Sequence, residues 1–363
     1  MVTGVGVAVR SDEQVDASVA RAFRMRPVAV VVTLTLLLVA TVASVATGAA
    51  GLPVSGVIRS LATQLPGLEL AGSLDPAQEA ILFSIRVPRT LLALLVGAAL
   101  GMAGAAYQGV FRNPLADPYL LGVSAGAGLG AVLTLGFGLD VGWGPVRALP
   151  MAAFAGGVLA VACSAVVSRG SFAHPPTLLL SGVAMAALFS ATQTFALHKL
   201  DPDRAREVLS WLFGSLAADG WDPVLLLLPY VVVCFAILTA YGRHLDVLRV
   251  EDDEARTLGL NPARVRLVVI GVATLVTAAA VAVSGLIAFV GVVVPHVVRL
   301  LAGHSYRIIV PLSAVVGGTF LVGTDMLART VVAPAELPVG IIAAFVGAPF
   351  FGYVLWRGTR ADR

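Results

Sequence analysis

The sequence predicts an all-α polytopic membrane protein with about ten membrane-spanning helices. Of its 363 residues 58% are hydrophobic and only 12% are charged, and the mean hydropathy is +0.93. Soluble domains carry roughly a quarter charged residues. Apolar runs recur along the whole chain, each close to the roughly 20 residues that a helix needs to cross a bilayer. These runs do not alternate between apolar and polar residues, so they favour helices over a transmembrane barrel.

The first apolar run follows an amino-terminal extension, residues 1–26, that we expect to be disordered and cytoplasmic. The run is longer than the 7–15 apolar residues of a secretory signal, so it is interpreted as an uncleaved first span. A single domain then covers residues 27–357, followed by a cytoplasmic tail, 358–363. Hydropathy predicts its spans at 27–49, 90–111, 119–138, 149–168, 176–198, 222–242, 264–284, 286–302, 308–327 and 338–356.

The orientation follows from the distribution of basic residues. With ten spans both termini lie on one side, and the loops of that side hold 16 of the 24 Lys and Arg residues. The positive-inside tendency therefore predicts cytoplasmic termini. The spans 264–284 and 286–302 are separated by almost no loop, yet removing either one would invert every later span. On this topology Arg86 and Arg89 lie outside, against the charge rule.

Glycines recur at four-residue spacing within two spans, which predicts close helix packing. The pattern joins Gly97 to Gly101 in one span and Gly122 to Gly126 and Gly130 in the next. Packing is favoured over direct contact with a transported molecule. The glycines at 126, 128 and 130 do not form a nucleotide-binding GxGxxG after a strand.

The sequence offers no candidate catalytic residues and no metal site, so we expect a transporter subunit and not an enzyme. Acidic residues lie in loops or at span ends, and the one histidine that follows a strongly apolar run, His296, is interpreted as structural. Cys163 and Cys234 have no metal-ligand spacing. The single lysine, Lys199, does not belong to a phosphate-binding loop, so any energy from ATP must enter through another subunit. Basic residues are explained by topology, which disfavours nucleic acid as a partner.

A polar loop at about 243–266 is the most informative cytoplasmic segment. Its acidic run, Glu251 to Glu254, suits the amino terminus of a short helix, and Gly259 before Asn261 and Pro262 suits its end. Composition alone leaves two interpretations open. The segment is either a solvated loop or a short helix through which another protein moves the spans.

Four stretches together resemble the FecCD-type permeases, the membrane subunits of ABC importers for iron–siderophore complexes, haem and cobalamin. The resemblance covers nearly all the chain after about residue 50. It is carried by RVPRTLLALLVGAALGMAGAAYQGVFRNPLADPYLLGVSAGAG from Arg86, EARTLGL from Glu254, GLIAFVGVVVPHVVRL from Gly285 and AELPVGIIAAFVGAPFF from Ala335.

The resemblance implies a bundle like that of the cobalamin importer, in the bacterial plasma (inner) membrane. It also implies the partners: a second permease subunit, identical or paralogous, two cytoplasmic ATPases and an extracytoplasmic binding protein. ATP and Mg²⁺ would be used by the ATPases, and no cofactor is expected on this chain. The family's coupling element, which sits in a groove of the ATPase, maps to Asp252, Asp253, Glu254, Ala255, Arg256, Leu258 and Gly259.

By the same resemblance, Arg86, Arg89 and Arg329 face outward and pair with glutamates of the binding protein. A guanidinium suits such pairing because it can bind a carboxylate through two parallel hydrogen bonds. Two alternatives stay open. Arg86 or Arg89 could reach lipid phosphates, and Arg329 could pair with Asp325 four residues earlier.

The function expected from the resemblance is import of an iron–siderophore complex by alternating access, powered by the partner ATPases. Haem and cobalamin are alternative cargoes. A secondary transporter driven by a gradient is a further alternative, but the lack of acidic residues within the spans counts against it.

Overall fold

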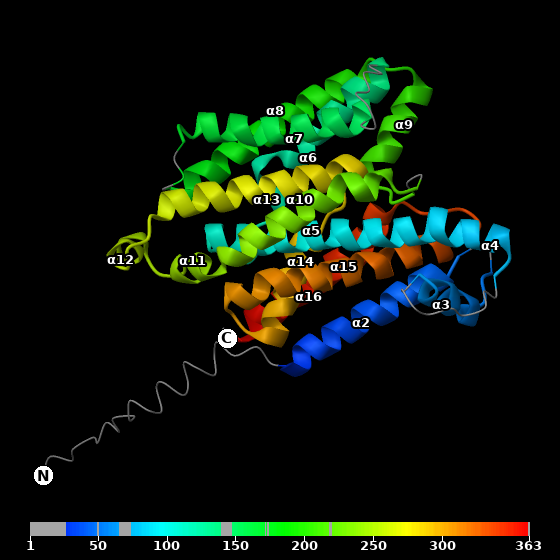
Figure 1. Cartoon of the computed structure of the whole chain (residues 1–363). Helices are drawn as coiled ribbons and strands as arrows, with labels where there is room; N and C mark the ends of the chain where they lie inside the picture. The colour runs from blue at the N-terminus through cyan, green and yellow to red at the C-terminus, as the bar shows by residue number, and fades with distance from the viewer. Residues whose placement is uncertain are drawn as a thin grey trace, which may run out of the picture.

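The computed structural model describes residues 27–48, 51–64, 74–138, 147–170, 172, 174–217 and 220–361, and every regular element in these ranges is helical (Figure 1). The predicted amino-terminal extension and the last two residues of the tail lie outside them. The helices are α2 (Pro27–Ala46), α3 (Val54–Ala62), α4 (Pro76–Ile81), α5 (Val87–Phe111), α6 (Val123–Ala131), α7 (Ala148–Val167), α8 (Pro175–His198), α9 (Pro202–Leu212), α10 (Asp222–Ala240), α11 (Gly242–Val247), α12 (Asp252–Thr257), α13 (Pro262–Ser284), α14 (Val290–Ala302), α15 (Tyr306–Thr330) and α16 (Val339–Ala361).

Each of the ten predicted spans coincides with an apolar helix. Seven of these helices are long and apolar enough to cross a membrane, and the remaining three are shorter. A π-helical turn, Leu82–Arg86, joins α4 to α5, so that the second span begins well before the predicted residue 90. The shorter helices are Val123–Gly136, Val290–Ala302 and the apolar part of α16, Val339–Val354.

The closely spaced pair of spans, 264–284 and 286–302, is the main difference from the prediction. The helix α13 ends at Ser284 as expected, but α14 begins only at Val290. Between them the backbone takes positive φ at Gly285 (68°) and at Phe289 (70°), which a helix cannot continue through. With 13 residues, α14 is about 20 Å long and too short to cross the hydrocarbon core alone.

The long helix α5 lies at the centre of the bundle and packs against α10, α13, α14 and α15. The predicted glycine spacing is the reason for its closest contacts. A Cβ added at Gly97 would lie 2.2 Å from the carbonyl oxygen of Gly317 on α15, and one at Gly126 on α6 would lie 2.1 Å from that of Gly156 on α7. The glycines therefore allow two backbones to touch, as the packing interpretation predicts.

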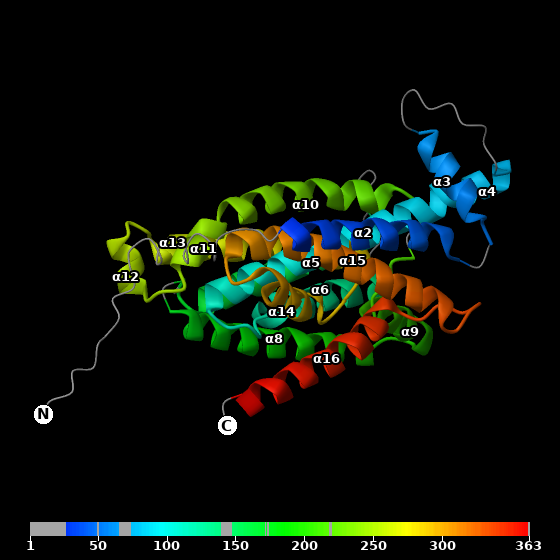
Figure 2. The ribbon, with the colours of Figure 1, turned by 90° about the horizontal axis from the view of Figure 1, so that it is seen from below.

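The elongated bundle has two ends, which we call the α4 end and the α12 end (Figure 1). The short helices α3 and α4 lie at one, and α11 and α12 lie at the other, after the end of α10. Figure 2 shows that α2 begins and α16 ends toward the α12 end. The described ends of the chain thus lie on the same side of the bundle, as an even number of crossings requires.

Candidate functional site

At the α4 end, a buried ion pair joins the start of α5 to the end of α15. The Arg89 guanidinium donates to Asp325 through Nε (3.0 Å) and Nη2 (2.9 Å), and Asp325 is completely buried. Nη1 of Arg89 lies 2.9 Å from a carboxylate oxygen of Glu336. The Glu336 side chain is 46% exposed, so it forms the solvent-facing edge of the cluster.

The other two arginines connect α2 to this cluster. Nε of Arg329 lies 3.0 Å from Asp325, while Nη1 donates to the carbonyl of Thr47 (3.0 Å) and Nη2 to the hydroxyl of Ser44 (2.9 Å). Arg86 donates to the carbonyl of Ala46 (2.8 Å). Carbonyls in the last turn of a helix lack intrahelical partners, so the guanidinium groups complete the hydrogen bonding of the end of α2.

The three predicted docking residues therefore come together, and each of them is largely buried within this chain. Arg86 is 5% exposed and Arg89 is 9% exposed, and the Arg329 side chain is 8% exposed. The pairing of Arg329 with Asp325, the alternative raised by the sequence, is present. The interaction of Arg89 with two carboxylates far along the chain could not be read from the sequence, since it depends on the antiparallel packing of α5 and α15.

At the α12 end, one carboxylate fastens α12 to two other helices. Asp252 receives two hydrogen bonds from Arg266 of α13, at 2.6 and 2.7 Å, and one from Arg112 at the end of α5, at 2.6 Å. Arg112 also donates to the carbonyl of Leu248 and adopts a left-handed conformation, with φ of 49°. Asp252 thereby connects the start of α12 to the adjoining ends of α5 and α13.

The electrostatics of this contact favour the charged carboxylate. The hydrogen bonds from Arg266 lower the pKa of Asp252 below its ordinary value, partial burial acts in the opposite direction, and Arg112 adds to the lowering. Because α12 starts at Asp252, the negative charge also lies at the positive end of the helix dipole.

Most of the predicted coupling residues form an exposed face on and just after α12. Asp253, Glu254 and Arg256 are exposed, and Leu258 exposes 69% of its surface. Gly259 has φ of 80° and ends the helix, as predicted, with its amide bonded to the carbonyl of Arg256 (2.9 Å). Leu258 is thus an exposed apolar side chain next to the charged residues of α12.

Two members of the predicted set do not fit a direct contact. Ala255 is fully buried, so its side chain packs α12 against the bundle and cannot reach another protein. Asp252 is occupied by Arg112 and Arg266 and positions the helix instead. Neither arginine was predicted as a partner of Asp252. Arg112 directly follows a span that is distant in the chain, and Arg266 lies near the start of α13.

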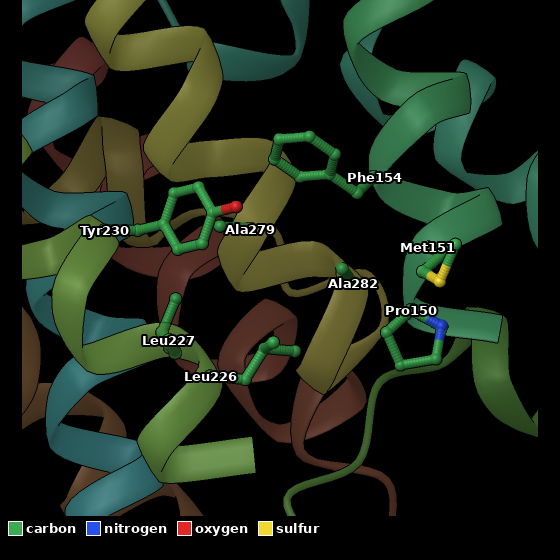
Figure 3. Close-up of a pocket in the computed structure, with 8 residues that line it drawn as sticks. All are labelled: Pro150, Met151, Phe154, Leu226, Leu227, Tyr230, Ala279 and Ala282. Atoms are coloured by element: carbon green, nitrogen blue, oxygen red, sulfur yellow. The ribbon is translucent and has the colours of Figure 1, made fainter. Parts of the chain in front are cut away.

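An apolar pocket of about 230 Å³ lies between α7, α10 and α13 (Figure 3). Its lining has one polar side-chain group, the hydroxyl of Tyr230, among aliphatic, aromatic and proline side chains. Figure 3 shows Phe154 and Met151 from α7 opposite Leu226 and Leu227 from α10. Among the described residues, the lining of this pocket therefore contains no carboxylate, imidazole or thiol.

Comparison with known proteins agrees with an all-helical membrane bundle. A family model for the FecCD transport family matches residues 36–357. The chain belongs to the FecCD transport family. It is 39% identical over 340 residues to the uncharacterized ABC transporter permease protein YvrB of Bacillus subtilis, covering 93% of this chain and 96% of that protein.

The cobalamin import permease BtuC of Halobacterium salinarum is 43% identical over 280 residues, 76% of this chain and 73% of BtuC. A solved ABC transporter assigned to the metal-chelate type, in an inward-facing conformation, superposes with a TM-score of 0.79 at 30% identity, covering 91% of this chain and 99% of that one. Further relatives are named for import of ferric citrate, haemin, ferric hydroxamate and molybdate.

This FecCD permease is therefore the membrane subunit of an ABC importer, a multi-pass protein of the inner membrane. The relatives are named as permease proteins of ABC transporters and of import systems. The expected family and fold class are confirmed.

Proposed function

We propose that this chain forms the pathway by which an iron–siderophore complex enters the cytoplasm through alternating access. Two permease subunits, identical or paralogous, enclose the pathway. A binding protein delivers the complex at the α4 end. Two cytoplasmic ATPases, which use ATP and Mg²⁺, act at the α12 end, and both termini are cytoplasmic.

The exposed face of α12 is the observation that carries this proposal. Leu258 and Arg256 are exposed on it, while Asp252 holds the helix to α5 and α13. A force applied to that face by an ATPase passes directly to two helices of the core. A short helix that merely closed a loop would need neither the exposed leucine nor the two arginines.

Iron–siderophore cargo is supported by relatives whose names specify ferric citrate and ferric hydroxamate. Cobalamin is the second candidate, because the BtuC relative has 43% identity over its matched region. Haem stays a third, since one relative is named for haemin transport. The named relatives thus span cargoes of different charge, and their names alone do not choose among them.

On docking, a carboxylate of the binding protein replaces Glu336 as a partner of Arg89 in the arginine cluster. Glu336 is half-exposed and bonded to Arg89, so it occupies the position that a carboxylate of the binding protein would take. Glu336→Gln is expected to strengthen docking by up to about fivefold, the range of an exposed ion pair. Unchanged affinity for the binding protein in a pull-down titration would remove Arg89 from the docking surface.

The decisive experiment measures uptake of labelled ferric siderophores, haem and cobalamin by cells with and without this gene. Loss of one ATP-dependent uptake on deletion supports the proposal and names the cargo. Each strain is tested with ATP depleted and, separately, with an uncoupler. Uptake that survives ATP depletion but collapses with the uncoupler would instead establish a gradient-driven transporter.

A further inference from the structure

A cavity of about 620 Å³ opens at the α12 end, apart from the exposed face of α12. Its wall is built from the end of α5, the end of α14, the start of α15 and the loop after α11. Small-molecule sites enclose roughly 300–1,000 Å³, so this cavity has room for a metal chelate.

The charge of the lining is one-sided. Three arginines, Arg112, Arg249 and Arg299, contribute to the wall, and no aspartate or glutamate among the described residues does. One of these arginines, Arg112, has a carboxylate partner, Asp252, and that carboxylate is shared with Arg266. The lining therefore holds uncompensated positive charge in a concave surface, where low-dielectric walls focus the field on a bound anion.

The guanidinium of Arg299 is held in place by two neighbouring side chains. Nη2 donates to the side-chain oxygen of Gln108, and the group lies 5.9 Å from the ring centroid of Tyr306. Gln108 is in turn fixed by donating to the carbonyl of Gly291 (3.2 Å). Nη1 of Arg299 is buried and has no hydrogen-bond partner among the described residues. A buried donor without a partner is costly, and an acceptor oxygen from a ligand would remove that cost.

Two histidines and an amide complete the polar wall. His296 and His304 line the cavity together with Asn113, and the carbonyl of His304 accepts a long hydrogen bond from Arg249 (3.5 Å). Imidazole and amide groups supply further hydrogen-bond donors next to the guanidinium groups. Such a mixture suits a ligand that carries several carboxylate or other oxyanion groups.

We propose that this cavity is a cytoplasmic exit site for an anionic metal chelate, one that presents carboxylate oxygens to Arg299 and Arg249. The inference rests on the proposed function, and it narrows the cargo to polyanionic complexes such as ferric citrate. Electroneutral complexes, such as a ferric tris-hydroxamate, gain nothing from this site.

The test measures binding of ferric citrate to the full-length chain in nanodiscs of phosphatidylcholine alone. Arg299→Gln and Arg249→Gln are each expected to weaken binding about tenfold, the usual loss for one charge-assisted hydrogen bond. Arg307→Gln is the matched control, because Arg307 is exposed at the same end and does not line the cavity. Arg249→Gln, at an exposed position, guards against misfolding of the Arg299 variant.

Several results would overturn the inference. One is equal loss in the Arg307 variant, and another is equal affinity for ferric citrate and a neutral ferric hydroxamate. If phosphatidylglycerol added to the nanodiscs abolishes ferric citrate binding, and native mass spectrometry shows the lipid lost only from the Arg299 variant, the site belongs to lipid headgroups. If no chelate binds but the variants lose co-purifying ATPase, the cavity instead receives a carboxylate of that subunit.

The outcome is separable from that of the proposed function. Binding in nanodiscs requires neither ATP nor partner proteins, whereas the proposed function is judged by uptake in cells. Arginine-dependent binding without ATP-dependent uptake would refute the function alone, and ATP-dependent uptake without such binding would refute the exit site alone.

Discussion

Replacing Asp325 by Asn should destabilise the protein more than any other change of a single charge at the α4 end. Asp325 is completely buried and neutralises both Arg89 and Arg329, at 2.9 and 3.0 Å. Asn keeps the shape of the side chain, but it leaves Arg329 without a counter-charge and Arg89 with only the half-exposed Glu336.

The size of the effect follows from the burial of the partners. The side chains of Arg89 and Arg329 are 10% and 8% exposed, so water cannot replace the lost carboxylate. Removing one member of a buried ion pair costs about 3–5 kcal/mol. Glu336→Gln removes the other carboxylate bonded to Arg89, but that group is 46% exposed, and its loss should cost about 0–1 kcal/mol.

The free energy of unfolding is measured from SDS-induced loss of helical circular dichroism in mixed micelles. A triple variant, Arg89→Met with Asp325→Leu and Arg329→Met, provides the matched control. Replacing all members of a buried ionic cluster with apolar groups is often neutral or stabilising, so this variant should recover most of the stability lost by Asp325→Asn. Equal stability of Asp325→Asn and Glu336→Gln would refute the reasoning, because burial would then not decide the cost.

Three further predictions concern other parts of the chain. Leu258→Ser should lower ATP-dependent uptake about tenfold or more without changing the amount of protein in the membrane. Thr257→Ser, on the same exposed segment, should leave uptake unchanged. Equal uptake by the two variants would contradict the coupling role. Gly97→Ala should lower the unfolding free energy by about 1–3 kcal/mol, because the added methyl would lie 2.2 Å from a backbone oxygen. Gly271→Ala should not destabilise the protein, because the space around Gly271 is open. Similar unfolding midpoints for the two variants would argue against the close helix contact. Burial raises the pKa of Asp117 from 3.8 to about 6, so the folded state binds more protons than the unfolded state. The unfolding free energy should therefore fall as the pH rises from about 4 to about 6. Asp117→Asn should remove this part of the pH dependence when the unfolding free energies of the two proteins are measured across that range.

The arrangement of helices along the chain could be predicted because its signals are local. Apolar length located the ten helices, and the four-residue glycine spacing predicted close helix packing, which the structure has between α5 and α15 and between α6 and α7. The start of α14 could not be predicted, since hydropathy does not report the positive φ at Phe289. Apolar length therefore overestimated this span.

The sites were predicted less completely because their geometry depends on distant partners. The acidic start and glycine stop of α12 are local and were found. Asp252 bonds to Arg112, which is 140 positions away in the sequence, and to Arg266, which is 14 positions away. Arg89 and Asp325 are 236 positions apart. The resemblance that singled out Arg86, Arg89 and Arg329 does not indicate that Asp325 and Glu336 both pair with Arg89.

A single rigid helix, α5, begins beside Arg89 and ends beside Arg112, with 25 residues and a length of about 37 Å. Each end of this helix is held by an ion pair with a carboxylate, Arg89 with Asp325 at one end and Arg112 with Asp252 at the other. A tilt of about 5° would shift one tip by roughly 3 Å relative to the other over this length. If, as proposed, a binding protein docks at the α4 end and an ATPase at the α12 end, and each prefers one tilt of α5, then each must change the affinity of the chain for the other by the same factor.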